Sequence, residues 1–258
     1  MSDAGLEAYL ARPLAAPDPA VLEALGRGPV DPAATLALAD LDRLLDPAPL
    51  AVENGWSTLP DGVGYVAVRT AMPAVSAAMV DWWFDWHPRD PLRYRVWHPL
   101  AHSDNSVEPP AVARAKAHWG TVHHPVEDVG TGAVHARIAF VAPTELGFSS
   151  DALDDPAVAT IACAWVGDDR RHVRHTAMAH VFLDEGDGVV LRSHFWLGAA
   201  IRPYLPPPLA AVGEAVLNRR PIRRLALPNG LAPALANHCA EEYANLASLL
   251  PELYALYG

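Results

Sequence analysis

The stretch APALANHCAEEYANLASLL, residues 232–250, predicts a long helix near the C-terminus. Its apolar residues recur at intervals of three and four, and this spacing brings them onto one face of a helix. His238 and Glu242 fall on that same face, whereas Cys239 and Glu241 point elsewhere. Pro251 is expected to end or kink the helix. The apolar face comprises Leu231, Leu235, His238, Glu242, Leu246 and Leu249.

Glu242 is the residue of this helix that needs a partner. A carboxylate on an inward apolar face is strongly unfavourable unless it is protonated, paired with a cation or bound to a metal. His238 lies one turn earlier, and a His and a Glu at this spacing can reach one cation. The residues alone leave two interpretations open, a satisfied buried pair and a metal site. His123 and Glu127 repeat the spacing, but Pro125 between them argues against a helix there.

The middle of the chain predicts an antiparallel sheet, because apolar and polar residues alternate over several runs. The alternation starts at Gly62. The stretch Gly186-Asp187-Gly188 is expected to join the last two strands as a hairpin. The later strands are predicted at residues 134–141, 158–166, 173–183 and 189–196.

Helices are predicted around this sheet, and several open with an aspartate that can cap free N–H groups. Helices followed by consecutive strands and a long terminal helix indicate an α+β fold in which the sheet wraps around one helix. We divide the chain into a helical N-terminal extension, residues 1–58, and one domain, residues 59–258. A turn is expected at Pro228-Asn229-Gly230. The further helices are predicted at residues 3–10, 18–25, 31–45, 72–86 and 209–217.

Composition argues against several classes of protein. With 51% hydrophobic residues, the 258-residue chain can bury a large core. A net charge of -11 argues against nucleic-acid binding. The N-terminus lacks a signal-peptide pattern and no apolar run reaches the roughly 18 residues of a membrane span, so we expect a cytoplasmic protein without a membrane partner. Cys163 and Cys239 are too few for a disulfide framework and are expected to be reduced.

Histidine is unusually frequent, with 12 in the chain. His98 and His102 flank Pro99, which could open a helical turn and put both imidazoles on one side. His98 also suits aromatic packing beside its neighbouring tryptophan, whereas His102 lies in polar surroundings that favour an exposed or functional role. Core or interface positions are expected for His194 and for Trp82, Trp83, Trp86 and Trp97.

His180 lies in the predicted strand 173–183, on the same face as Thr176 and Met178. Alternation does not decide which face is inside. If His180 faces the terminal helix, it is a neutral imidazole in an apolar cavity, suited to acid–base chemistry. Otherwise it is a strand-end histidine in water.

Several separated segments of the chain form a recognisable set. They are WWFDWH (82–87), RYRVWHPLAHSDN (93–105), VEDVG (126–130), RSHFWLG (192–198) and NHCAEEYANL (237–246). Together they resemble the 2,4-diacetylphloroglucinol hydrolase and phloretin hydrolase family. They occur in the order expected for that family, and the similarity extends over roughly residues 60–250.

This resemblance implies a zinc-dependent hydrolase on a Bet v 1-like helix-grip fold, formed by residues 59–258, and a homodimer. Its reaction is cleavage of the carbon–carbon bond between an acyl group and a polyhydroxylated aromatic ring, so the expected partner is a small aromatic ketone. The implied metal ligands are His102, Glu127, His238 and Glu242. Fe²⁺ or Mn²⁺ would also accept two His and two carboxylates.

The resemblance also implies roles beside the metal. Tyr94 and Asn105 match residues that hold phenolic hydroxyls, and His180 matches a histidine that contacts the acyl group. Phe195 stands where the family has a substrate-contacting tyrosine, so a different ring pattern or acyl ketone is expected. Two other functions stay open: an aromatic polyketide carrier, and a cyclase-like enzyme of natural-product biosynthesis on the same scaffold.

Overall fold

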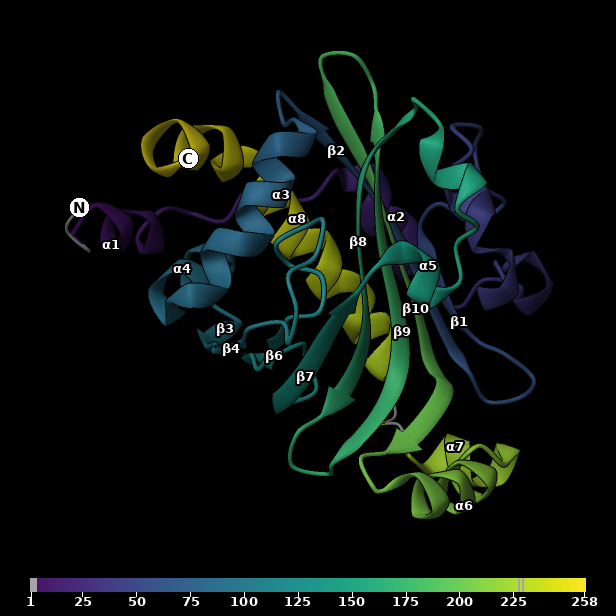
Figure 1. Cartoon of the computed structure of the whole chain (residues 1–258). Coiled ribbons are helices and arrows are strands. Elements are labelled where there is room, and N and C mark those ends of the chain that lie inside the picture. Colours follow the sequence, from purple (N-terminus) through teal and green to yellow (C-terminus); the bar gives the residue numbers. More distant parts are fainter. Residues whose placement is uncertain (1–3, 227, 229) are drawn as a thin grey trace.

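The computed structural model describes residues 4–226, 228 and 230–258. A curved antiparallel sheet wraps around helix α8 (Leu231–Tyr257), which crosses its concave face (Figure 1). The predicted α+β class and the Bet v 1-like helix-grip arrangement are therefore confirmed. Asp3 in the first predicted helix and Asn229 in the predicted turn lie outside the described residues.

Long neighbouring strands carry most of the sheet, and alternation in the sequence predicts each of them. They are β2 (Gly64–Pro73), β7 (Ala133–Val141), β8 (Val158–Asp168), β9 (Val173–Asp184) and β10 (Gly188–Pro203). The predicted hairpin between β9 and β10 is confirmed, because the N–H of Glu185 donates to the carbonyl of Gly188 across the turn.

Short strands that the sequence pattern does not reveal complete the sheet. They are β1 (Gly55–Thr58), β3 (His102–Asp104), β4 (Val107–Glu108), β5 (Val122–His123) and β6 (Val126–Asp128). The strand order is β1-β2-β10-β9-β8-β7-β5-β4, and β6 pairs with both β7 and β3. The pairing of β1 with β2 crosses the division between residues 58 and 59, which stays a prediction.

The helices agree in part with the predictions. Pro251 does not end α8, which continues six residues further to Tyr257. Pro73 ends β2 instead of opening a helix, and α3 begins only after Ser76, whose side chain caps it. Three helices of the described residues, α4 (Pro91–Trp97), α5 (Pro143–Leu146) and α7 (Arg220–Ala226), are not predicted. The other helices in these residues are α1 (Ala4–Leu10), α2 (Pro19–Gly26), α3 (Ala77–Trp86) and α6 (Pro207–Leu217).

The prediction of a helix over residues 31–45 is wrong. This segment forms two short 3-10 turns, Pro32–Ala34 and Leu38–Leu44, and Asp40 has a non-helical backbone. Its leucines pack on the convex face of the sheet, and the carbonyl of Leu36 accepts a hydrogen bond from the indole of Trp196. Contacts with the sheet therefore override the local preference for a helix.

The sheet separates two apolar cores. Met178 and Phe182 of β9 face α8, whereas Ala179 and Val181 face the 3-10 turns on the other side. Alternation along one strand thus serves both cores. The tryptophan cluster joins the first core, where Trp82 and Trp86 contact the aromatic end of α8, as predicted.

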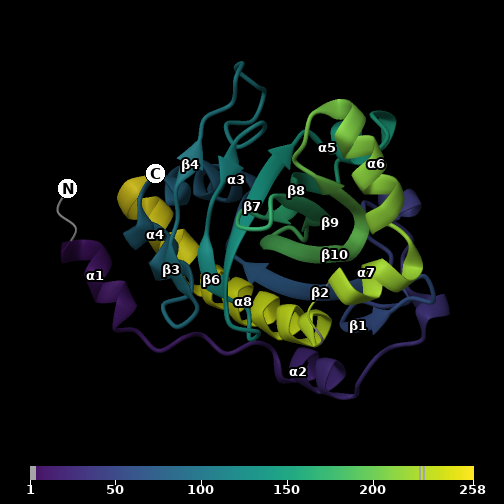
Figure 2. The ribbon, with the colours of Figure 1, turned by 90° about the horizontal axis from the view of Figure 1, so that it is seen from below.

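The remaining predictions about burial and thiols are also met. His194 is fully buried between Tyr65 and Trp196 in the second core. Cys163 and Cys239 are free thiols. The segment between α1 and α2 follows α8 on the side away from β9 (Figure 2). Within the described ranges, no helix has the length and hydropathy of a membrane span.

Candidate metal centre and its cavity

Two histidines and two glutamates converge where the short strands meet α8. His102 begins β3 and is paired directly opposite Glu127 of β6. His238 and Glu242 extend from successive turns of α8. The four residues named from the sequence as metal ligands are therefore brought together from three elements.

Ligand atoms of His102, Glu127 and His238 all lie within 4.8 Å of one another, and Glu242 approaches both histidines. Nε2 of His102 lies 3.6 Å from Oε2 of Glu127 and 3.6 Å from Oε2 of Glu242. Nε2 of His238 lies 3.7 Å from Oε2 of Glu242 and 4.0 Å from Oε2 of Glu127. Two ligand atoms that are each about 2.0–2.2 Å from one tetrahedral zinc ion lie roughly 3.3–3.6 Å apart. The observed separations are thus slightly wider than those of a tetrahedral site.

Both imidazoles are in the protonation state that binds a metal ion. Nδ1 of His102 is 3.1 Å from the carbonyl of Tyr94, so it carries the proton and leaves Nε2 as an acceptor. Nε2 is buried and has no hydrogen-bond partner among the described residues. Burial lowers the pKa of His102 and that of His238 to about 4, so both rings are neutral at neutral pH. A neutral imidazole is the form that binds metal.

The ionised form of the Glu242 carboxyl group is disfavoured by burial. Burial raises the pKa of Glu242 to about 8, although the nearby His238 opposes the shift. A divalent cation is a partner that holds a buried carboxylate ionised. The donor set of two neutral imidazoles and two carboxylates therefore fits a divalent ion.

A surrounding layer of side chains supports these ligands. Tyr94 stacks on His102 and donates its hydroxyl proton to Glu127. His98 stacks on His238 with ring centroids 5.3 Å apart, and its Nε2 lies 3.3 Å from a carboxylate oxygen of Glu241. A hydrogen-bonded turn after α4 brings the rings of His98 and His102 within 5.6 Å, as the Pro99 spacing suggests. His98 thus packs against the candidate ligand His238 as well as against its aromatic neighbours.

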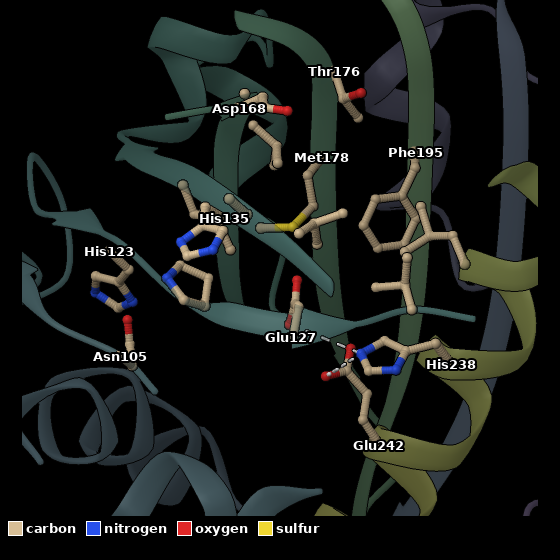
Figure 3. A pocket seen from close by; sticks show the side chains of 18 of the residues that line it. Asn105, His123, Glu127, His135, Asp168, Thr176, Met178, Phe195, His238 and Glu242 are labelled. Atoms are coloured by element: carbon tan, nitrogen blue, oxygen red, sulfur yellow. Dashed lines mark ion pairs between the residues drawn. The ribbon is translucent and has the colours of Figure 1, made fainter. Parts of the chain in front are cut away.

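A cavity of about 170 Å³ opens beside these candidate ligands (Figure 3). Apolar side chains form most of its wall, including Met178 and Phe195 of neighbouring strands. Thr176 and His180 also face it, which resolves the question of which face of β9 is inside. The cavity therefore lies between the concave face of the sheet and α8.

His180 is a neutral imidazole in this apolar wall. Its Nδ1 is 2.9 Å from Oγ of Ser193, directly across the β9–β10 pair. Burial lowers the pKa of His180 to about 3. The rings of Phe195 and Tyr243 approach it at 5.5 and 4.9 Å. Its Nε2 has no hydrogen-bond partner among the residues described.

Tyr94 and Asn105 also line the cavity, as does the unpredicted His123. Asn105 is buried between β3 and β4, and its Oδ1 lacks a hydrogen-bond partner within the described part of the chain. His123 and Glu127 come from different strands rather than from a helix, in agreement with the interrupting Pro125. No periodic signal marks His123, because β5 has only two residues.

Comparisons with known proteins identify relatives over most of the chain. The model of the DAPG hydrolase PhiG domain family matches residues 36–255. The 2,4-diacetylphloroglucinol hydrolase of Pseudomonas protegens is 30% identical over 232 residues, which are 87% of this chain and 75% of that protein. The phloretin hydrolase of Eubacterium ramulus is 28% identical over 236 residues, 88% of this chain and 81% of that protein.

Solved structures give a more distant likeness. The ZhuI aromatase/cyclase of a Streptomyces species is 14% identical, with a TM-score of 0.34 over 68% of this chain and 93% of that one. A similarity of this degree carries no argument about function.

Proposed function

The chain belongs to the DAPG hydrolase family, and we propose that it is a metal-dependent hydrolase of acylated, polyhydroxylated aromatic rings. The reaction adds water across the carbon–carbon bond between the acyl group and the ring. The hydroxyl group of the water goes to the acyl carbon and its proton goes to the ring carbon, which yields a carboxylic acid and the deacylated phenol. The observation that supports this proposal is the cluster of His102, Glu127 and His238 beside an apolar cavity, with Glu242 within 3.7 Å of both histidines.

We propose zinc as the ion, held by these four side chains, although Fe²⁺ and Mn²⁺ accept the same donors. When bound, the ion supplies Lewis-acid chemistry for the oxygen atoms of the reactants. Two carboxylates keep the total charge of the site low, as suits a catalytic rather than a structural centre.

The polar side chains of the cavity orient the ring. Because Tyr94 donates its own proton to Glu127, its oxygen acts toward the substrate as an acceptor of a phenolic hydrogen bond. Burial and Glu127 raise the pKa of Tyr94 well above its ordinary value, so the hydroxyl stays protonated. Asn105 offers a second polar contact. The apolar walls exclude bulk water and hold the aromatic ring in place.

We assign to His180 the transfer of the proton that the ring carbon must receive. A ring carbon leaves readily only after protonation to the keto tautomer, which neighbouring hydroxyl groups make accessible. The ring of His180 is neutral, and Ser193 fixes its Nδ1 while Nε2 is left for the ligand. His180 therefore holds or relays a proton, or stabilises the oxygen on which negative charge develops.

The test combines elemental analysis of the purified protein with hydrolysis assays on acylphloroglucinols. Glu242→Ala is expected to lose both the metal and turnover. His180→Ala is expected to keep the metal and lose turnover. Glu252→Ala, at an exposed glutamate of α8 that pairs with Arg12, is the control that keeps both. Full activity in Glu242→Ala, or a purified protein without stoichiometric metal, overturns the proposal. Product analysis separates acid release from a cyclase reaction, which forms an isomer, and from a carrier, which returns the ligand unchanged.

A further inference from the structure

One wall of the cavity carries a buried histidine that the proposed reaction leaves without a role. His123 projects from β5 and is 3% exposed. Its ring packs against Phe140 with 4.6 Å between centroids and meets His87 edge-on at 5.7 Å. Residue Val107 of β4 is paired opposite His123, and Asn105 precedes Val107 by two positions. In Figure 3 the amide end of Asn105 points toward the His123 ring.

The hydrogen bonds of Thr121 determine which nitrogen of His123 carries the proton. The hydroxyl of Thr121 donates its single proton to the carbonyl of His118 at 2.6 Å. Its oxygen lies 3.2 Å from Nε2 of His123 and must therefore accept from an Nε2–H group. His123 is thus the Nε2–H tautomer, and its Nδ1 has a free lone pair.

This lone pair is open to a ligand. Nδ1 of His123 has no hydrogen-bond partner within the described residues, and the ring lines the cavity. Burial lowers the pKa of His123 well below its ordinary value, and the neighbouring His87 and His118 act in the same direction. The ring therefore stays neutral at neutral pH, and Nδ1 stays an acceptor.

We propose that His123 forms a hydroxyl-binding subsite, whose Nδ1 accepts a hydrogen bond from a phenolic O–H on the part of the ring remote from His238. In the view of Figure 3, Glu127 lies between His123 and His238, so this contact is separate from those at the metal centre. The inference rests on the proposed function for its choice of an aromatic ring as ligand.

The subsite has a definite chemical preference. A lone pair without a proton accepts from a hydroxyl, but it makes no hydrogen bond with a methoxy group or a bare C–H edge. Phe195 offers no hydroxyl on the β10 wall, so His123 gives the cavity a polar contact from β5 instead. The favoured ligands are therefore rings with a free hydroxyl beyond those bound at the metal centre and by Tyr94.

The experiment compares the binding of phloroglucinol, which has three hydroxyl groups, with that of resorcinol, which has two. Neither compound has an acyl group, so calorimetric titration of the metal-loaded protein measures ring recognition without turnover. The wild type is expected to bind phloroglucinol about tenfold more tightly, as one hydrogen bond in a buried site provides. His123→Phe keeps a planar ring but removes the acceptor, and it should bring the two affinities together.

A second variant and a control keep this test specific. His123→Asn places an amide oxygen near the position of Nδ1 and is expected to restore most of the preference. His172→Asn, at an exposed histidine of the β8–β9 turn whose positive φ of 50° asparagine tolerates, should preserve the preference. An unchanged preference in His123→Phe, or no preference in the wild type, overturns the subsite. Ring binding without hydrolysis of any acylphloroglucinol would instead refute the proposed reaction and leave the subsite standing.

Discussion

Tyr94 lies parallel to His102, with 4.0 Å between the ring centroids and 2° between the ring planes. The carbonyl of Tyr94 accepts from Nδ1 of the same histidine, and its hydroxyl donates to Glu127. One residue of α4 therefore orients two proposed ligands that come from two different strands. Such outer contacts tune a metal site nearly as strongly as the ligands themselves.

Tyr94→Phe separates these contributions, because the variant keeps the stacking and the carbonyl but loses the hydroxyl. We expect the affinity for Zn²⁺ to fall by about 10- to 100-fold. Competition with a chromophoric chelator measures this change. Tyr254→Phe, on the far part of α8 against Trp82, is the matched control and should bind zinc like the wild type. Equal zinc affinity in all three proteins would show that Tyr94 contributes nothing to the site through its hydroxyl.

Zinc should also stabilise the fold, because an ion that binds only the folded chain shifts the unfolding equilibrium. At a free concentration about 100 times the dissociation constant, the gain is about 2.7 kcal/mol. For a chain of this size, that gain corresponds to a rise in Tm of roughly 5–10 °C. Thermal unfolding with and without zinc measures it. The rise should persist in Glu252→Gln, which alters an exposed glutamate of α8, and disappear in Glu242→Gln. A full rise in the latter variant would exclude Glu242 as a ligand.

The two halves of the proposed metal site differ in how far the sequence predicts them. His238 and Glu242 share a helical face, and this periodicity alone indicates that they act together. His102 and Glu127 meet through the pairing of β3 with β6, strands of three residues each. Strands so short have no readable alternation, so the resemblance to a family is what pointed to these two residues.

The fold shows the same division. Alternation predicts the long strands and puts His180 on one face of β9. It does not say whether that face is turned toward α8, because both faces of the sheet are covered by apolar cores. The segment 31–45 fails as a helix because its leucines pack against the convex face of the sheet. Such errors arise where contacts distant in sequence outweigh local preference.

Because His194 is buried, we expect the stability of the fold to depend on pH. Burial lowers the pKa of His194 to about 3, and neither of its nitrogens has a partner among the described residues. Between the unfolded pKa of about 6.5 and this lowered value, the unfolded chain binds a proton that the folded chain does not. The free energy of unfolding therefore falls as the pH decreases, by about 1.4 kcal/mol per pH unit for this one group.

His194→Phe removes the titrating group and keeps a ring between Tyr65 and Trp196. Between pH 7 and pH 5, we expect this variant to lose about 2 kcal/mol less unfolding free energy than the wild type. Urea denaturation at the two pH values measures the difference. His172→Asn is the control, because His172 is exposed and has a positive φ of 50° that Asn tolerates. Identical pH dependence in wild type and His194→Phe would contradict the assignment.

Arg192 fastens the segment after the 3-10 turns to the convex face of the sheet. Its side chain is 3% exposed. It donates to the carbonyls of Leu44 at 3.2 Å and Ala48 at 2.8 Å, and also to that of Asp46. A further bond of 3.1 Å reaches a carboxylate oxygen of Glu53. One side chain of β10 therefore holds residues 44–53 against the sheet through hydrogen bonds.

Arg192→Met should therefore destabilise the fold far more than the loss of a surface ion pair. The variant leaves Glu53 without its buried cation and several carbonyls without a donor, so we expect the unfolding free energy to fall by about 3–5 kcal/mol. Arg69→Met is the matched control on β2, because Arg69 pairs with Glu185 at the solvent-exposed surface; its expected loss is about 0–1 kcal/mol. Urea denaturation of both variants measures the contrast. Similar losses in the two would mean that the buried guanidinium is not what holds residues 44–53 on the sheet.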